Sequence, residues 1–291
     1  IRTSFLAVAL LAAVPIAHAE AIQTREHRVQ IVTVVQGLER PWGLAFLPDG
    51  RKLVTERPGR MRVVDRDGKL DPVPVAGLPR VDAQGQGGLL DVVLHPKHRD
   101  NGWIYWSYAQ RDGKGDNGTE VARGRLAGGP GAWRMENVEV IFRMAPKTNS
   151  GFHFGSRLVF DRDGLLYVTL GDRGDMARAQ RLDDHAGKIL RLTDDGKPAP
   201  GNPFLNDPKA KPEIFSLGNR NVQGAAIHPA TGALWAHEHG PQGGDELNAI
   251  RAGANYGWPV ITYGVNYVSG TKIGEGTEKA GMAQPLKYWV P

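Results

Sequence analysis

Short stretches of alternating apolar and polar residues, separated by turns, recur along most of the chain. One pattern, two apolar stretches on either side of a turn, appears four times, in residues 42–56, 87–108, 155–172 and 222–240. Three of these turns carry an Asp-Gly or Thr-Gly dipeptide, which tolerates the positive φ of a tight hairpin. Each copy therefore predicts an antiparallel β-hairpin.

A second unit follows the first and third copies, in residues 61–70 and 189–198, and predicts an outer hairpin. Two hairpins per repeat make a four-stranded blade. We therefore expect an all-β fold, a six-bladed β-propeller of four-stranded antiparallel blades, with a β-sandwich as the alternative. Because the chain ends in KYWVP, which does not complete a strand pattern, the last blade is expected to be incomplete.

The composition agrees with a globular protein of many short strands. The 291 residues include 38 Gly, 20 Pro and no Cys, and 41% are hydrophobic. The absence of cysteine excludes disulfide scaffolds and thiolate metal sites. The net charge is +5, but basic and acidic residues are interleaved, so no basic face for nucleic acid is expected.

The first residues have the pattern of a secretory signal peptide. Arg2 precedes an apolar run that ends at Ile16, and a small-x-small cleavage pattern follows at residues 17–19. The run is too short to span about 30 Å of hydrocarbon. We expect residues 1–19 to be removed, leaving a periplasmic or secreted domain of residues 20–291 without a membrane span.

Five glycine-rich loops stand at corresponding ends of the repeats. They cover residues 81–88, 149–156, 170–175, 217–224 and 237–248. In a propeller such loops converge at the mouth of the central channel, where glycine lets the backbone approach a ligand closely. The sequence therefore predicts one shared site.

His153 is the candidate general base of this site, because an imidazole can accept a proton at neutral pH. Asp172 could orient the ring, although it could also only cap its turn. Arg220 and Asn221 offer donors to a carboxylate or carbonyl oxygen, or could lie on the surface. Gln86 could likewise face a ligand or only the turn backbone.

The loop at residues 237–248 offers metal ligands. Asp245 and Glu246, beside Gly and Pro carbonyls, form an oxygen donor set that suits Ca²⁺, although no calcium-loop motif is present. His237 and His239 could form a Zn²⁺ or Cu²⁺ pair, but no third ligand is evident.

Taken together, the segments GQGGLLDVVLHP, FHFGSRLVF, LYVTLGDRGD, GKILRL, LGNRNVQG and HGPQGGDELN, followed by NYGWP, give the chain a resemblance to a known family. The chain resembles the soluble quinoprotein aldose sugar dehydrogenases, which are related to soluble glucose dehydrogenase. The resemblance covers residues 34–291 in family order.

The resemblance implies residue roles. His153 would take the proton of the anomeric hydroxyl, with Asp172 as its hydrogen-bond partner and Arg220 stabilising charge on the quinone. The residues that would bind pyrroloquinoline quinone (PQQ) are Gln86, Arg220, Asn221 and Tyr267. The carbonyls of Gly240 and Pro241 would hold the Ca²⁺ at the quinone, and Glu246 with the Tyr256 carbonyl would hold a second, structural Ca²⁺.

The implied activity is oxidation of aldose sugars at C1 to lactones, with electrons passed to an external acceptor. Phe152 stands where soluble glucose dehydrogenase has an acidic residue, which favours a broad aldose specificity. The family's later Lys and Arg residues, which grip the acid groups of the quinone, would fall beyond Pro291. The alternatives are a calcium-dependent propeller lactonase and a non-catalytic propeller that binds proteins or glycans.

Overall fold

The computed structural model describes residues 21–290, so the predicted signal peptide lies outside the described residues. The chain divides into two units, Ile1–Gln36 and Gly37–Pro291. In the first unit, β1 (Ala21–Gln23) and β2 (Arg28–Gln30) form an antiparallel hairpin. All the elements discussed below belong to the second unit.

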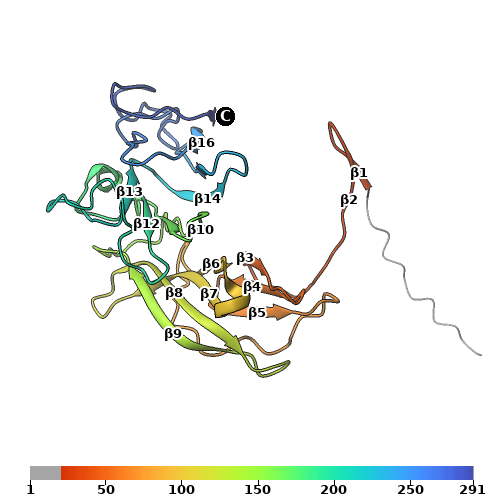
Figure 1. The fold of residues 1–291 in the computed structure, drawn as a ribbon. Coiled ribbons are helices and arrows are strands. Elements are labelled where there is room, and N and C mark those ends of the chain that lie inside the picture. The colour runs from red at the N-terminus through yellow and green to blue at the C-terminus, as the bar shows by residue number, and fades with distance from the viewer. Residues whose placement is uncertain (1–20, 291) are drawn as a thin grey trace, which may run out of the picture. The chain divides into compact units, whose positions relative to one another are not determined.

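The second unit consists of four antiparallel sheets, each built from strands that are consecutive in the chain (Figure 1). The first sheet contains β3 (Pro41–Phe46), β4 (Lys52–Glu56) and β5 (Arg60–Val64). The second contains β6 (Leu89–Leu94), β7 (Trp103–Arg111), β8 (Asn117–Ala127) and β9 (Arg134–Arg143). The third contains β10 (Leu158–Phe160), β11 (Leu166–Thr169), β12 (Lys188–Leu192) and β13 (Ile214–Leu217). The fourth contains β14 (Val222–Ile227), β15 (Leu234–Glu238), β16 (Asp245–Ala249) and β17 (Lys287–Trp289).

The first strands of the sheets meet one another, as the blades of a propeller do. β3 contacts β6, β6 contacts β10, and β10 contacts β14, while β9 lies at the outer edge of the second sheet (Figure 1). Helix is confined to α1 (His98–Asn101) and the 3₁₀ turn η1 (Met176–Gln180) in the described part. Neither is long and apolar enough to cross a membrane. The fold is an all-β propeller.

The four predicted hairpins are confirmed, because they are the first two strands of the four sheets. The predicted six four-stranded blades are not observed. Residues 21–290 form four blade sheets, and the first of these has three strands. The predicted outer hairpins are also wrong in their second arms. Leu70 and Pro198 make only isolated bridges, and β13 supplies the fourth strand of the third sheet. Pro198 has no N–H to donate to a ladder, which limits pairing there.

The hydrophobic core lies between neighbouring sheets. Trp106 of β7 packs in the cluster shared with the first sheet, whereas Tyr105, the preceding residue, packs in the cluster shared with the third. Val168 and Tyr167 of β11 divide in the same way between the second and fourth sheets. Since successive side chains of a strand point to opposite faces, both faces of each inner strand are buried.

Hydroxyl side chains join each sheet to the next. Thr169, at the end of β11, accepts a hydrogen bond from Arg157 N at 2.9 Å and donates to Val222 O of β14 at 2.8 Å. Ser107 makes the same two bonds from β7, to Asp91 N and Ser156 O, and Thr55 makes them from β4. One hydroxyl therefore satisfies a backbone N–H at the first strand of its own blade and a backbone carbonyl at the first strand of the next blade.

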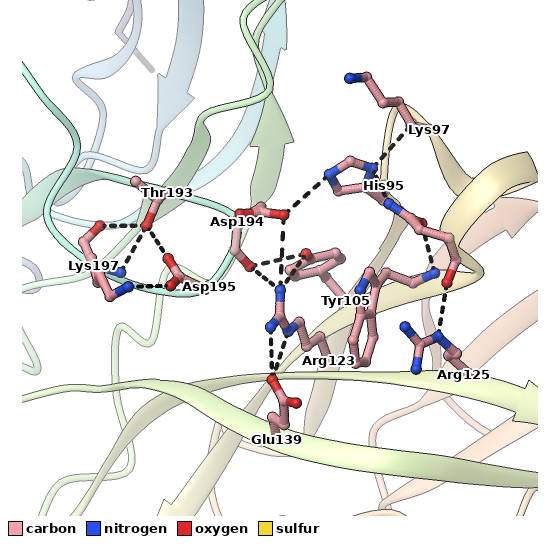
Figure 2. A network of polar contacts seen from close by, with 12 residues as sticks. His95, Lys97, Tyr105, Arg123, Arg125, Glu139, Thr193, Asp194, Asp195 and Lys197 are labelled. Atoms are coloured by element: carbon pink, nitrogen blue, oxygen red, sulfur yellow. Dashed lines mark hydrogen bonds and ion pairs between the residues drawn. The ribbon is translucent and has the colours of Figure 1, made fainter.

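A second junction between the second and third sheets lies around Asp194 in the turn that follows β12 (Figure 2). Its backbone carbonyl accepts hydrogen bonds from Tyr105 Oη at 2.9 Å and Arg123 Nη1 at 3.0 Å. Arg123 also pairs with Glu139 at 2.8 Å, and His95 Nε2 lies 3.6 Å from the Asp194 carboxylate. This polar network holds the turn of one blade against the strands of its neighbour.

Candidate active site

Most of the predicted site residues line one cavity of about 610 Å³. Its lining includes Gln86, His153, Arg220, Asn221, Gly240, Pro241 and Tyr267. Four of the five predicted loops contribute lining residues, and the fifth contributes Asp172, which contacts His153. The structure therefore brings these loops together.

His153 is held in the geometry of a base with an orienting partner. Its Nδ1 lies 2.6 Å from Asp172 Oδ1, and the ring retains 12% exposure. A carboxylate only accepts hydrogen bonds, so Nδ1 is the donor and Nε2 is left as the nitrogen that can accept a proton. The other oxygen of the buried Asp172 accepts a bond from Trp258 Nε1 at 2.8 Å, which fixes the carboxylate.

The backbone around His153 explains the glycines of this motif. His153 has a φ of 50°, in the left-handed region, and its N–H donates to Gln86 Oε1 at 2.8 Å. A Cβ at Gly171 would collide with the carbonyl of His153. Glycine at position 171 therefore lets the loop that carries Asp172 approach His153 closely.

Arg220 is buried and bonded to backbone oxygens. Its Nη1 donates to His239 O at 3.1 Å and Gly240 O at 2.5 Å, and its guanidinium lies 5.4 Å from the Trp258 ring. In the described chain no carboxylate forms an ion pair with its guanidinium, although it lines the cavity. Asn221 beside it accepts a bond from Gly155 N at 3.1 Å and so contacts the loop that carries His153.

Glu246 lies opposite Glu238 on adjacent strands, and both border a small second cavity with Tyr256. Burial raises the pKa of both carboxyls, and Glu238 further raises the pKa of Glu246. Asn248 Nδ2 lies 3.4 Å from Glu238 and 3.2 Å from Glu246. A buried acid paired with a half-buried one would be relieved of mutual repulsion by a hard cation.

The alternative histidine pair is not gathered into a metal cluster. His239 lines the main cavity with its Nδ1 3.6 Å from Asp245, and His237 lies against Gly224. Among residues 21–290, no group of three or more His, Cys, Asp or Glu side chains could hold a metal ion. A cation in the main cavity would therefore need backbone carbonyls among its ligands.

Sequence reasoning missed several residues that shape the site. Trp258 and Glu238 support Asp172 and Arg220, and Trp289 lines the cavity. Trp258 belongs to the NYGWP segment and Glu238 to the loop of residues 237–248, so their segments were recognised and their contacts were not. Tyr267, 59% exposed, lies 6.0 Å from the Arg220 guanidinium.

The fold and the site define a member of a known enzyme family. The family model described as glucose/sorbosone dehydrogenase matches residues 38–291, and the chain belongs to this family. The aldose sugar dehydrogenase YliI of Escherichia coli is 43% identical over 291 residues, which cover 99% of this chain and 76% of the relative.

Solved structures agree with the sequence relationship. The soluble aldose sugar dehydrogenase of Escherichia coli in its apo form superposes with a TM-score of 0.83 at 45% identity, over 87% of this chain and 72% of that chain. The PQQ-bound aldose sugar dehydrogenase of Streptomyces coelicolor gives a TM-score of 0.75 at 34% identity, over 89% of this chain and 71% of that chain. The family supports a sugar oxidoreductase.

Proposed function

We propose that the protein is a PQQ- and calcium-dependent aldose sugar dehydrogenase that oxidises aldoses at C1 to lactones. The observation that carries the proposal is the shared cavity, into which His153, backed by Asp172, and the buried Arg220 both project. A base and a fixed cation at one site are what removal of a proton and stabilisation of negative charge require.

The cavity residues fit PQQ. The Arg220 guanidinium is buried without an ion pair among the described residues, so a multiply charged anion would supply the missing counter-charge. Gln86 and Asn221 add amide groups, and Tyr267 adds an aromatic ring for a planar molecule. When bound, PQQ supplies an electrophilic quinone that accepts a hydride from the sugar carbon.

The chain's own part in the reaction is proton transfer. His153 Nε2 takes the proton of the anomeric hydroxyl while Asp172 stabilises the resulting imidazolium through Nδ1. Since Trp258 holds the second carboxylate oxygen, the ring is fixed before substrate binds. Gln86 restrains the His153 backbone, which reduces the reorganisation that catalysis needs.

Two calcium sites are part of the proposal. Gly240 and Pro241 line the cavity, and Gly240 O, although bonded to Arg220, has a second lone pair for a cation. Glu246, with the Tyr256 carbonyl, would form the second site, and the facing Glu238 adds negative charge to it. The first ion would polarise the quinone and the second would stabilise the fourth sheet.

Phe152 supports a broad aldose specificity. Its ring is 59% exposed and lies 6.1 Å from the His153 ring, so an apolar surface borders the base. An apolar ring makes no directional bond to one particular hydroxyl, unlike an acidic side chain.

We further propose a periplasmic or secreted location and an external electron acceptor.

Reconstitution tests the function. Apoprotein is mixed with PQQ, Ca²⁺, an aldose and an artificial electron-accepting dye, and dye reduction is followed with PQQ or Ca²⁺ omitted in controls. We expect sugar-dependent reduction that requires both. No reduction, together with hydrolysis of a lactone, would replace the proposal by the lactonase, and inactivity in both assays would favour a non-catalytic binding propeller.

A further inference from the structure

Arg173, which directly follows Asp172, has an environment unusual for a surface loop. Its side chain is almost fully buried, with 2% exposure of the residue, and its φ of 62° lies in the left-handed region. Its guanidinium carbon lies 3.4 Å from the centre of the Phe154 ring. Burial lowers its pKa to about 9, so the side chain still carries its charge at neutral pH.

This guanidinium binds the loop that carries His153. Nη2 donates to Ser150 O at 2.5 Å, and Nη1 donates to Phe152 O. The intervening carbonyl, of Gly151, accepts instead from Gln86 N at 2.8 Å. Three successive carbonyls next to the base are therefore held from two sides, the outer two by Arg173.

The geometry needs the forked shape of arginine. The same Nη2 also donates to Asn117 Oδ1 at 2.5 Å, and the amide of Asn117 donates in turn to Asp82 at 2.9 Å. A guanidinium can bind separate acceptors in a fixed plane, whereas a lysine ammonium is a compact point charge. Asn117 on β8 thus anchors Arg173 to the second sheet.

We propose that Arg173 is a positioning residue for the reaction: it holds the loop of residues 149–156 so that His153 keeps its place against Asp172 and the cavity. The inference rests on the proposed function only for its effect on turnover. Its effect on the loop and on the position of the imidazole can be measured in the apoprotein, without PQQ or substrate.

Three variants test the inference. Arg173→Met removes the donors, Arg173→Lys retains the charge without the fork, and both keep a non-glycine residue at the φ of 62° of position 173. Arg62→Met is the matched control, since Arg62 is also buried, donates to the Asp71 carbonyl at 2.8 Å and lies in the first sheet.

Hydrogen exchange of the loop is the first measurement, made on the apoproteins. The amides of His153 and Gly155 donate to Gln86 and Asn221, so their exchange reports the position of the loop. We expect exchange across residues 149–156 to rise about tenfold in Arg173→Met and to rise also in Arg173→Lys. Carbethoxylation of His153 should accelerate in parallel, and Arg62→Met should change neither.

The second measurement separates binding from turnover in the reconstituted enzyme. We expect kcat to fall about 10- to 100-fold in Arg173→Met while the Kd for PQQ changes little, because a displaced base affects the chemical step. Loop exchange and kcat within twofold of wild type, or equal losses in Arg62→Met, would overturn the inference. If Arg173→Met does not fold, Arg173→Lys decides by the same criteria.

The two proposals fail separately. If wild-type protein shows no sugar-dependent dye reduction, the proposed function fails, and exchange and carbethoxylation in the apoproteins still decide the role of Arg173. If wild type is active and the Arg173 variants keep both their loop exchange and their kcat, the positioning role alone is refuted.

Discussion

His153 can act through a single nitrogen, because Asp172 Oδ1 occupies the other at 2.6 Å. In the proposed reaction its contribution is therefore to accept a proton and not to hold the cofactor. The side chain of His228 bonds only to Thr231 in its own turn. His228 therefore serves as a control histidine outside the site.

Replacing His153 by Ala should consequently lower turnover about 10²- to 10⁴-fold, the usual range for loss of a general base. The Kd for PQQ should stay close to that of wild type, since the cofactor donors are other side chains. Dye-reduction kinetics and a PQQ titration check the two parts, with His228→Ala as control. Near-wild-type turnover would remove His153 from the mechanism.

A buried lysine gives a prediction about pH. Lys188 is fully buried and donates to Arg178 O at 2.9 Å and Ala186 O at 2.6 Å, and burial lowers its pKa to about 7. Between this value and the ordinary lysine value of 10.5, the unfolded chain binds the proton and the folded chain does not. Stability from this group therefore rises with pH in that window.

In Lys188→Met this rise should be absent, although the variant also loses two hydrogen bonds. The difference in unfolding free energy, wild type minus variant, should grow by up to about 1.4 kcal/mol per pH unit from pH 7 to 10. Urea denaturation at several pH values measures it, with the exposed Lys209→Met as control. A difference independent of pH would contradict the burial argument.

At the scale of residues, the sequence predicted those with distinctive chemistry and missed those that support them. His153 and Arg220 could be found because few side chains do what an imidazole or a guanidinium does. Trp258 could not be assigned to Asp172, because 86 positions separate the two in the chain and only the folded loops bring them together. Nothing in the sequence distinguishes Arg173 from the rest of the loop of residues 170–175, because its burial arises only in the fold.

At the scale of elements, the hydroxyl junctions explain how blades are joined near the site. Thr169 links Arg157 N of its own sheet to Val222 O of the next sheet, and its side chain is fully buried. His237 stands at the corresponding place of the fourth sheet, where β15 replaces the hydroxyl by an imidazole.

Thr169→Val keeps the shape of the side chain and removes both bonds. It should lower the unfolding free energy by about 1–3 kcal/mol, because a partly buried N–H and a buried carbonyl lose their partner. Thermal or urea denaturation measures the loss, and the exposed Thr277→Val should be close to neutral. Equal stability of the two variants would show that the junction contributes nothing.

The predictable and unpredictable strands differ in how local their pairing is. Hairpins such as β10 with β11 depend on one turn and on alternation, which a single sequence displays. The pairing of β12 with β13 spans a long connection, and that of β16 with β17 spans a longer one. Such pairings depend on packing between sheets, which local patterns do not encode.

At the scale of the whole molecule, the site is a product of the propeller arrangement. Gln86, His153 and Asn221 each come just before the first strand of a different sheet, and these first strands lie next to one another. Loops distant in sequence therefore share one cavity. The recurring glycine-rich loops predicted this convergence, whereas the pairing of Glu238 with Glu246 needed the register of β15 and β16.

That register leads to a prediction about calcium and global stability. Without a cation, the carboxylates of the buried Glu238 and the half-buried Glu246 repel each other, and desolvation raises the pKa of both. An ion that binds only the folded protein stabilises it by about 2.7 kcal/mol when present at 100 times its Kd. Calcium added to chelator-treated protein should therefore raise Tm.

Glu246→Gln tests both the charge repulsion and the stabilisation by calcium, because it removes one of the two opposing charges and one cation ligand. Without calcium the variant should be at least as stable as wild type, and with calcium it should gain much less. Glu275→Gln, in which the replaced acid is exposed, should respond like wild type. Thermal scans over a calcium series measure these differences, and an equal rise in Tm for Glu246→Gln and wild type would place the stabilising ion elsewhere.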